Sequence, residues 1–309
     1  MNNHCAMKPI HPLHGLVAAT HTPFAADGSL NLAIIERQAA HLLKHGITTV
    51  FIGGTTGETS SLTLDERLAL AQRWSEVARG TTLRVVIHVG SNCLADARVL
   101  AAQAQKLGVI AISAFAPSYF KPRSLDLLIA CCADVAAAAP QTPFYYYDIP
   151  SLTGVSFSMP DFLAAAVERI PTLVGLKFTN ADLMAYQSCL RGPWDVPFGL
   201  DELLLGALAM GARGAVGSGF NFAAPIYNRL FAAFGRGDMA AAREEQFRGV
   251  RVIQILADRG YVGATKAVMK MLGVDVGPAR LPNNTLSAAE TTALREELEG
   301  IGFFKWVAS

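Results

Sequence analysis

Charged side chains are scarce in this sequence of 309 residues. They account for 17% of it, whereas an average soluble domain has roughly 25%. The 26 basic residues nearly balance the 25 acidic ones, and a formal net charge of +1 gives no electrostatic drive towards nucleic acid or an anionic membrane. Hydrophobic residues make up 51%, which excludes a disordered chain. Because a monomer's surface would be sparsely charged, we expect other subunits to cover part of it.

Long apolar runs and paired cysteines are absent as well. No stretch reaches the roughly 18 consecutive apolar residues that a membrane-spanning helix needs. The chain does not start with a basic segment followed by an apolar one, so a signal peptide is not expected. The odd cysteine count and the absence of Cys-x-x-Cys argue against a disulfide framework or a zinc site, and predict buried free thiols in a reducing, cytoplasmic compartment. The five cysteines are Cys5, Cys93, Cys131, Cys132 and Cys189.

Short apolar, β-branched runs recur along the chain. Several are apolar on both faces, as expected for strands that are covered on both sides. Segments with a helical period lie between them, and one opens with Thr63-x-x-Glu66, a capping-box pattern. Strand and helix alternating eight times is typical of a (β/α)8 TIM barrel, an α/β fold. The eight runs are Leu16–Thr20, Thr48–Ile52, Arg84–Val89, Val109–Phe115, Phe144–Tyr147, Leu173–Phe178, Val196–Gly199 and Gly214–Val216.

A doubly wound sheet is the structural alternative to the barrel. Such a sheet usually has fewer strands and a glycine-rich phosphate loop after the first one, but residues 20–24 contain no glycine. We therefore predict an N-terminal arm over 1–14, a catalytic barrel over 15–237 and a C-terminal helical extension over 238–309. The extension reads as helices only, so it is not expected to be an independent domain.

The chemistry of such barrels lies at the carboxyl ends of their strands. The second run ends in Gly53-Gly-Thr-Thr-Gly-Glu58. Its glycines permit a tight turn, in which backbone N–H groups and the hydroxyls of Thr55 and Thr56 can hold an anion such as a carboxylate. A plain connection from strand to helix is the alternative.

Lys177 is the only one of eight lysines that lies inside an apolar run. Burial favours the neutral amine, which can attack a ketone and form a Schiff base, an electron sink for breaking a carbon–carbon bond. The alternative is a lysine that reaches water from a strand end. Tyr145 and Tyr147 share one face of the fifth run. If that face is the barrel interior, a phenol can relay a proton there, whereas simple aromatic packing is the alternative.

Two further strand ends carry polar residues. The seventh run is followed by Asp201 and Glu202, whose carboxylates can accept hydrogen bonds from sugar-like hydroxyls or can cap the helix that follows. The eighth run leads to Ser218, in a segment that otherwise reads as a loop. No cluster of His, Cys, Asp and Glu has metal-binding spacing, and no Walker or Rossmann loop occurs. The sequence therefore predicts neither a metal nor a nucleotide cofactor.

Together these strand ends resemble the class I aldolases of the dihydrodipicolinate synthase and N-acetylneuraminate lyase superfamily. The resemblance runs from Gly15 to about Pro282. Its markers are Gly53-Gly-Thr-Thr-Gly-Glu58, Tyr147-x-Ile-Pro150, Gly175-Leu-Lys177 and Gly214-Ala-Val-Gly-Ser218. Within the superfamily the sequence is most similar to the animal-type N-acetylneuraminate lyases, on the segments 144–154, 175–179 and 198–202.

The resemblance implies a role for each matching residue. Lys177 would form the Schiff base, and Tyr147, helped by the substrate carboxylate, would move the proton during cleavage. Thr55 and Thr56 would hold the pyruvoyl carboxylate, and Tyr119 would reach the active site of a neighbouring subunit. The residues implied for the hydroxylated sugar chain are Thr179, Gly199, Asp201, Glu202 and Ser218.

The resemblance also implies an activity and an assembly. The expected reaction is reversible cleavage of N-acetylneuraminate (sialic acid) to N-acetylmannosamine and pyruvate by a homotetramer. The expected partner is a small-molecule 2-keto acid, with no nucleic acid and no membrane. No metal or other cofactor is needed, because the protonated imine supplies the electrophile.

Departures from the family pattern keep other substrates open. Leu152 stands where the synthases have an arginine for a second carboxylate group, which argues against a dihydrodipicolinate synthase. Asp148, Gly219 and Phe220 differ from the usual lyase residues, so another 2-keto sugar acid, cleaved by an aldolase or hydro-lyase of the same superfamily, is an alternative. A barrel that binds a keto acid without turnover is a third hypothesis, but pure binding requires neither the lysine nor the tyrosine.

Overall fold

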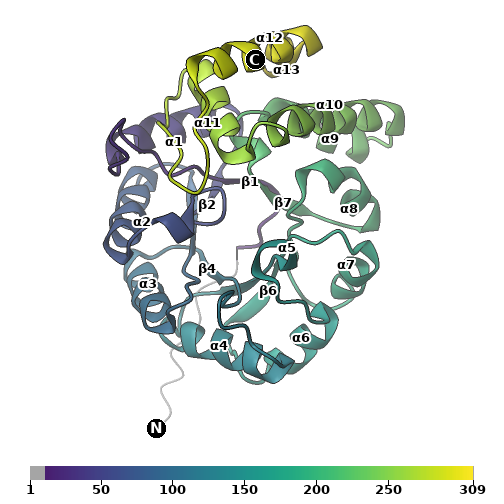
Figure 1. The fold of residues 1–309 in the computed structure, drawn as a ribbon. Helices are drawn as coiled ribbons and strands as arrows, with labels where there is room; N and C mark the ends of the chain where they lie inside the picture. The colour runs from purple at the N-terminus through teal and green to yellow at the C-terminus, as the bar shows by residue number, and fades with distance from the viewer. Residues whose placement is uncertain (1–10, 309) are drawn as a thin grey trace.

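The computed structural model describes residues 11–308, so most of the predicted arm over 1–14 lies outside the described residues. Parallel strands form one sheet, in the order β6-β5-β4-β3-β2-β1-β7. The sheet curls into a barrel, seen along its axis in Figure 1. The strands are β1 (Gly15–Ala19), β2 (Thr49–Ile52), β3 (Arg84–His88), β4 (Ala111–Ala114), β5 (Phe144–Asp148), β6 (Leu173–Phe178) and β7 (Gly214–Gly217).

One of the eight predicted strands, 196–199, is present only as isolated parallel bridges. Phe198 bridges Phe178 of β6 and Ala215 of β7, so this segment fills the gap between the two edge strands. Pro197 has no N–H to donate, which interrupts a regular ladder at this point. The barrel is thus a (β/α)8 fold in which irregular backbone occupies one strand position, the seventh along the chain.

Helices surround the barrel, and most of them connect one strand to the next (Figure 1). The predicted capping box is formed: the hydroxyl of Thr63 accepts the N–H of Glu66, and the Glu66 carboxylate accepts the N–H of Thr63. The helices between strands are α1 (Ile35–Lys44), α2 (Leu64–Ala78), α3 (Leu94–Leu107), α4 (Leu125–Ala137), α5 (Pro150–Thr153), α6 (Met159–Ala166), α7 (Leu183–Cys189) and α8 (Leu204–Met210). The helices after β7 are α9 (Ala224–Gly235), α10 (Met239–Ala257), α11 (Tyr261–Met271), α12 (Ala288–Ile301) and α13 (Phe303–Val307).

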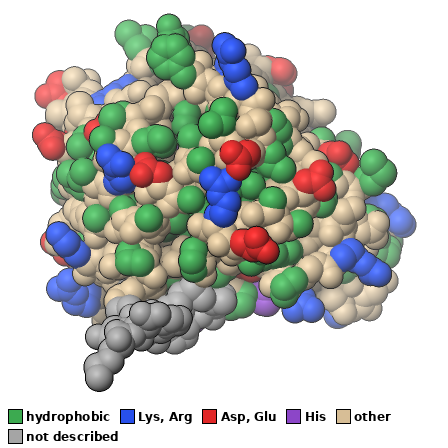
Figure 2. Space-filling model, turned by 90° about the horizontal axis from the view of Figure 1, so that it is seen from below, with side chains coloured by type: hydrophobic (Ala, Val, Ile, Leu, Met, Phe, Trp, Pro, Cys, Tyr) green, Lys and Arg blue, Asp and Glu red, His purple; other side chains and the backbone are tan. Residues whose placement is uncertain are grey.

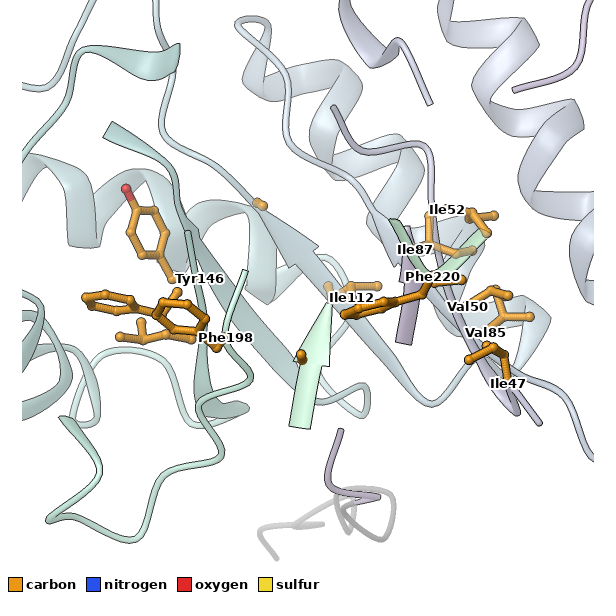
Figure 3. Close-up of a cluster of buried hydrophobic side chains, with 14 of the residues drawn as sticks. Ile47, Val50, Ile52, Val85, Ile87, Ile112, Tyr146, Phe198 and Phe220 are labelled. Atoms are coloured by element: carbon orange, nitrogen blue, oxygen red, sulfur yellow. The ribbon is translucent and has the colours of Figure 1, made fainter. Parts of the chain in front are cut away.

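The strands separate two apolar cores. Side chains that point outward, among them Val50, Ile52, Val85 and Ile87, pack between the barrel and its helices (Figure 3). The opposite faces of the same strands fill the barrel interior. The buried interior side chains are Leu13, Val17, Ala19, Phe51, Val86, Ala111, Tyr145, Tyr147, Ile149, Val174 and Val216. Tyr145 and Tyr147 therefore lie on the interior face, as their alternation allowed.

An irregularity in β6 brings Lys177 to the same interior face. The pairing of β5 with β6 shifts by one residue after Phe144, and beyond the shift Tyr147 lies opposite Lys177. The shift brings β6 close to the irregular segment, where a β-carbon on Gly175 would lie 1.7 Å from the carbonyl oxygen of Asp195. Only glycine fits at that position, which gives the Gly-Leu-Lys motif a packing reason.

The charged side chains on the surface are mixed in sign, as the nearly balanced numbers of acidic and basic residues predict. On the face shown in Figure 2, acidic and basic side chains are interspersed among hydrophobic ones, and neither sign forms a patch. No helix among the described residues is long and apolar enough to cross a membrane. Cys132 and Cys189 are buried, Cys131 is half-buried and Cys93 is exposed, so the expectation of buried thiols is correct for two residues and wrong for Cys93. Cys5 lies outside the described residues.

Candidate active site

A cavity of about 150 Å³ lies at the carboxyl ends of the strands. It collects residues from β1, β2, β5, β6 and β7 or the loops after them, together with residues of helix α11. The lining residues are Ala19, Thr55, Thr56, Tyr147, Ile149, Lys177, Thr179, Gly199, Val216, Gly217, Ser218, Tyr261, Val262 and Thr265. Seven of the residues singled out in the sequence are thus brought together around one space.

Among the described residues Lys177 supplies the only amine in the cavity lining, and its surroundings are aromatic. The residue is 4% exposed, and its Nζ lies 3.9 Å from the ring centroid of Tyr147 and 4.2 Å from that of Phe51. Within the described chain no carboxylate forms an ion pair with it. The rings hold a positive charge through their π faces, yet leave the nitrogen without an oxygen partner. Such an amine is accessible to an electrophilic carbon in the cavity.

Tyr147 faces the turn that follows β2. Its hydroxyl lies 3.3 Å from the hydroxyl of Thr55, and either group can donate. Phe51 and His88 pack edge-on against the Tyr147 ring, with centroids 5.7 and 5.8 Å away, and so fix its plane. The phenol is thereby linked to a second hydroxyl at the mouth of the barrel. This pair can pass a proton between a bound molecule and the turn.

Thr179 and Gly199 form the side of the cavity next to the lysine. The Thr179 hydroxyl is buried and has no hydrogen-bond partner in the described chain. A β-carbon on Gly199 would lie 1.9 Å from this hydroxyl, so glycine is required for the threonine to stay where it is. A buried hydroxyl without a partner is costly unless a ligand or water meets it. The Thr179 hydroxyl is therefore available to a ligand in the cavity.

Helix α11 closes the cavity from a part of the chain that sequence reasoning did not single out. The Tyr261 hydroxyl lies 2.8 Å from that of Ser218. Thr265, one turn further along the helix, lines the same space and lies 2.9 Å from the ring nitrogen Nε2 of His21. Nothing in the local sequence of an apolar helix marks these two residues, since their position depends on how the helix packs on the barrel.

Asp201 lies behind the cavity wall. Its Oδ2 accepts the N–H of Gly219 at 2.7 Å, and its carboxylate occupies the space that a side chain on Gly217 would fill. Burial raises the pKa of Asp201 to about 7, although the hydrogen bond from Gly219 opposes this shift. The structure thus places a carboxyl group able to titrate near neutral pH next to the cavity, and not in its lining.

Besides Asp201, two of the residues singled out in the sequence do not join the cavity of this chain. Glu202 is partly exposed and is absent from the lining. Tyr119 is 79% exposed, in the loop after β4, and pairs edge-on with Phe120, which is 86% exposed. The Oδ1 of Asn92 accepts the N–H of Tyr119 at 3.0 Å, so the loop that carries the ring is held in place.

The residues that depart from the lyase pattern point away from the cavity. Asp148 is buried on the outer side of β5, where Asn180 donates to it at 3.3 Å. Burial raises the pKa of Asp148 to about 6. Phe220 packs on Tyr227, with centroids 4.9 Å apart, and Gly219 leaves room for the Asp201 carboxylate. None of the three departures adds a side chain to the cavity lining.

A larger groove of about 710 Å³ lies between the loop after β1 and helices α11 and α12. Its lining is mainly apolar, and its charged side chains include the exposed pair of Lys270 with Asp275. It contains none of the strand-end residues described above. In the part of the chain that the structure covers, no group of three or more His, Cys, Asp and Glu side chains could hold a metal ion. The smaller cavity is therefore the candidate active site.

A parallel barrel with a buried lysine and hydroxyl groups at its strand ends is the architecture of a known family. Residues 12–301 match the Dihydrodipicolinate synthetase family, and the chain belongs to it. It is 39% identical to the N-acetylneuraminate lyase of Pongo abelii over 305 residues, which cover 96% of this chain and 95% of that protein.

The chain is also similar to solved structures of N-acetylneuraminate lyases. The N-acetylneuraminate lyase of Proteus mirabilis is 40% identical with a TM-score of 0.92, and the match covers 95% of this chain and 100% of that one. The N-acetylneuraminate lyase (sialic acid aldolase) of Aliivibrio salmonicida is also 40% identical with a TM-score of 0.92, covering 95% of this chain and 98% of that one.

Proposed function

We propose that this protein is an N-acetylneuraminate lyase, a carbon–carbon lyase that reversibly cleaves sialic acid to N-acetylmannosamine and pyruvate. The observation that carries the proposal is the position of Lys177, whose Nζ lies between two aromatic rings at a cavity lined by hydroxyl groups. The similarity to N-acetylneuraminate lyases over nearly the full chain supports the same reaction.

The reaction begins when the Lys177 amine attacks the ketone carbon of the substrate, and loss of water gives an iminium ion. Tyr147, helped by the substrate carboxylate, takes the proton from the hydroxyl on the carbon that becomes the aldehyde. The carbon–carbon bond next to it breaks, and its electron pair moves into the iminium to give an enamine. Protonation of the enamine carbon and hydrolysis of the imine then release pyruvate and restore the amine. The imine is the electrophile, so the mechanism uses no metal or other cofactor.

The other predicted site residues fall into two groups, one for the substrate carboxylate and one for the sugar chain. Thr55 and Thr56 would bind the carboxylate with their hydroxyls and with the N–H groups of the turn, and the link from Thr55 to Tyr147 supports this. The residues proposed for the sugar chain are Thr179, Gly199, Asp201, Glu202 and Ser218. The free hydroxyl of Thr179 supports its proposed contact with the sugar chain. Asp201 and Glu202 lie outside the cavity lining, so the polyol chain of the substrate would have to extend beyond the lining to contact them.

The exposed ring of Tyr119 fits a role in a second copy of the chain. An aromatic pair that is exposed and held by Asn92 would be covered in a homotetramer, where Tyr119 reaches the neighbour's active site. The low charge of the chain supports such contacts. We place the enzyme in the cytoplasm, since its described cysteines are free thiols. Light scattering tests the assembly, and a monomer would contradict it.

One experiment tests the chemistry. The protein is incubated with pyruvate, reduced with borohydride and digested for mass spectrometry. The proposal requires a covalent adduct on Lys177, and the absence of any adduct there would leave a barrel that binds a keto acid without turnover. Comparison of kcat/KM for N-acetylneuraminate with that for other 2-keto acids then tests the substrate. Much faster turnover of another acid would assign the enzyme to that substrate instead.

A synthase that binds a second carboxylate group is disfavoured by helix α5, which follows β5. Leu152 is 63% exposed and offers no charge where such a group would need one. Incubation with pyruvate and aspartate semialdehyde tests this alternative directly, and we expect no condensation product.

A further inference from the structure

The turn that carries Thr55 and Thr56 ends in an unusual backbone conformation. Glu58 has φ 54° and ψ 40°, in the left-handed region that favours glycine. Among residues 11–308 it is the one non-glycine residue with a positive φ. A side chain is held in such a conformation only where the surrounding structure fixes it, and strain of this kind is concentrated at functional sites.

The Glu58 side chain is fully buried and has charged and polar partners. Its Oε1 lies 2.6 Å from the Nζ of Lys266 on helix α11, and both side chains are nearly inaccessible, at 0% and 2% exposure. Its Oε2 accepts the N–H of Arg280 at 2.7 Å and an amide hydrogen of Asn283 at 3.3 Å. The carboxylate thus anchors the end of the turn to two separate C-terminal segments.

Lys266 is also linked to the same end of the turn by a second route. Its ammonium group donates to the carbonyl oxygens of Thr22 at 3.0 Å and Pro278 at 2.7 Å. The hydroxyl of Thr22 in turn donates to the carbonyl oxygen of Gly57 at 2.7 Å. Burial lowers the pKa of Lys266, and the charge of Glu58 opposes this shift. One buried ammonium group is therefore linked twice to the end of the turn, directly at Glu58 and through Thr22 at Gly57.

The rest of the turn is held from inside the barrel. The Nδ1 of His88 lies 3.1 Å from the carbonyl oxygen of Gly53, at the start of the turn. Thr55 and Thr56 lie between this contact and Glu58, and neither is tied down by a buried charge of its own. Helix α11 also carries Thr265, next to Lys266, in the wall of the cavity. The pair thus joins two walls of the same cavity, the turn after β2 and helix α11.

We propose that Glu58 and Lys266 are positioning residues, which hold the turn of Thr55 and Thr56 in the shape that binds the substrate carboxylate. The inference rests on the proposed function, because it assigns the carboxylate to this turn. Neither side chain lines the cavity between turn and helix, so both act through the backbone of the turn. Loss of either charge leaves its partner buried without a counter-charge, and the left-handed conformation of Glu58 loses its anchor.

The test uses the adduct with pyruvate, measured at increasing pyruvate concentrations in Glu58→Gln, Lys266→Met and the double variant. Lys270→Met is the matched control, because Lys270 lies one turn further along α11 and pairs with Asp275 at the surface. We expect the half-saturating pyruvate concentration to rise by about tenfold or more in each of the three variants, as loss of a charge-assisted contact implies. The adduct at saturating pyruvate should stay complete.

The kinetics of cleavage give a second readout. KM for N-acetylneuraminate should rise in the same variants while kcat changes little, since Lys177 and Tyr147 are untouched. Wild-type half-saturation in all three variants would overturn the inference. Loss of the adduct at every pyruvate concentration in all three would also overturn it, because the pair would then support the fold as a whole. Failure of the wild-type protein to form any adduct would instead refute the proposed function.

Discussion

Two buried lysines of this protein have nearly the same exposure and opposite surroundings. Lys177 is 4% exposed and Lys266 is 2% exposed. Lys266 meets the Glu58 carboxylate and two carbonyl oxygens, whereas the Nζ of Lys177 lies against the rings of Tyr147 and Phe51 and has no ion-pair partner among the described residues. Burial by itself therefore does not distinguish the two lysines. The two nitrogens differ in their partners, because an ion pair holds the Lys266 ammonium group whereas the Lys177 side chain lines the cavity.

The largest effect is expected from the lysine without oxygen partners. Lys177→Ala should abolish the borohydride-trapped adduct and lower kcat by about a thousandfold or more, because no other described residue brings an amine to the cavity lining. Mass spectrometry of the reduced protein and a coupled assay for pyruvate release measure the two effects. Substantial turnover in this variant, or an adduct that maps to Lys266, would remove the distinction between the two lysines.

The next largest effect on turnover is expected from Tyr147, whose ring packs on Lys177. Tyr147→Phe keeps the ring that packs on Lys177 and removes only the hydroxyl, so the adduct should still form. Turnover should fall by about 10²- to 10⁴-fold, the usual contribution of a general acid–base group. Single-turnover cleavage of N-acetylneuraminate measures this step, and a rate equal to that of the wild type would assign the proton transfer to another group.

For the free energy of unfolding, we expect the larger effect from Lys266 and the smaller one from Lys177, the reverse of their effects on turnover. Lys266→Met leaves the Glu58 carboxylate buried without a counter-charge, and should lower the free energy of unfolding by about 3–5 kcal/mol. Lys177→Met breaks no ion pair, and should change it by less than about 1.5 kcal/mol. Urea unfolding at one protein concentration compares the two variants. Equal losses would mean that the oxygen partners of Lys266 contribute little.

Two buried carboxyl groups, Glu58 and Asp201, differ in the same way, and the difference should appear in how stability depends on pH. Glu58 has a lysine partner, but Asp201 has no ion-pair partner in the described part of the chain, and burial raises the pKa of Asp201 to about 7. Between about pH 4 and pH 7 the folded state keeps this proton while the unfolded state has lost it, so this group destabilises the fold increasingly as pH rises. Above pH 7 the effect is constant. The difference in free energy of unfolding between Asp201→Asn and the wild type should therefore shift in favour of the variant from pH 4 to pH 7. Urea unfolding at several pH values measures it, and a difference that stays constant would contradict the raised pKa of Asp201.

The smallest effect is expected from an exposed lysine on the helix of Lys266. Lys270 pairs with Asp275 at 2.9 Å, and its side chain is 68% exposed. Lys270→Met should change the free energy of unfolding by less than about 0.5 kcal/mol, as is usual for surface ion pairs. A loss similar to that of Lys266→Met in urea unfolding would show that helix α11 is sensitive to any substitution.

Much of the barrel could be predicted from the sequence because its pattern is local. Apolar β-branched runs and capping signals are set by neighbouring residues, and the predicted capping box at Thr63 is confirmed. The predicted strand over 196–199 is formed only as isolated bridges, since one proline removes a donor from a short ladder. Alternation along the fifth run could place Tyr145 and Tyr147 on one face, but not decide which face was interior.

The sequence by itself determined the barrel, and it placed one lysine and one glycine-rich turn at strand ends, because strand periodicity and glycine turns follow from local sterics. Only the tertiary structure decided the partners of each lysine. Glu58 and Lys266 are far apart in the chain and meet because helix α11 packs across the turn after β2. Tyr261 and Thr265 enter the cavity for the same reason. The chemistry of a buried group depends on its neighbours in space, and those are fixed only when the helices pack on the barrel.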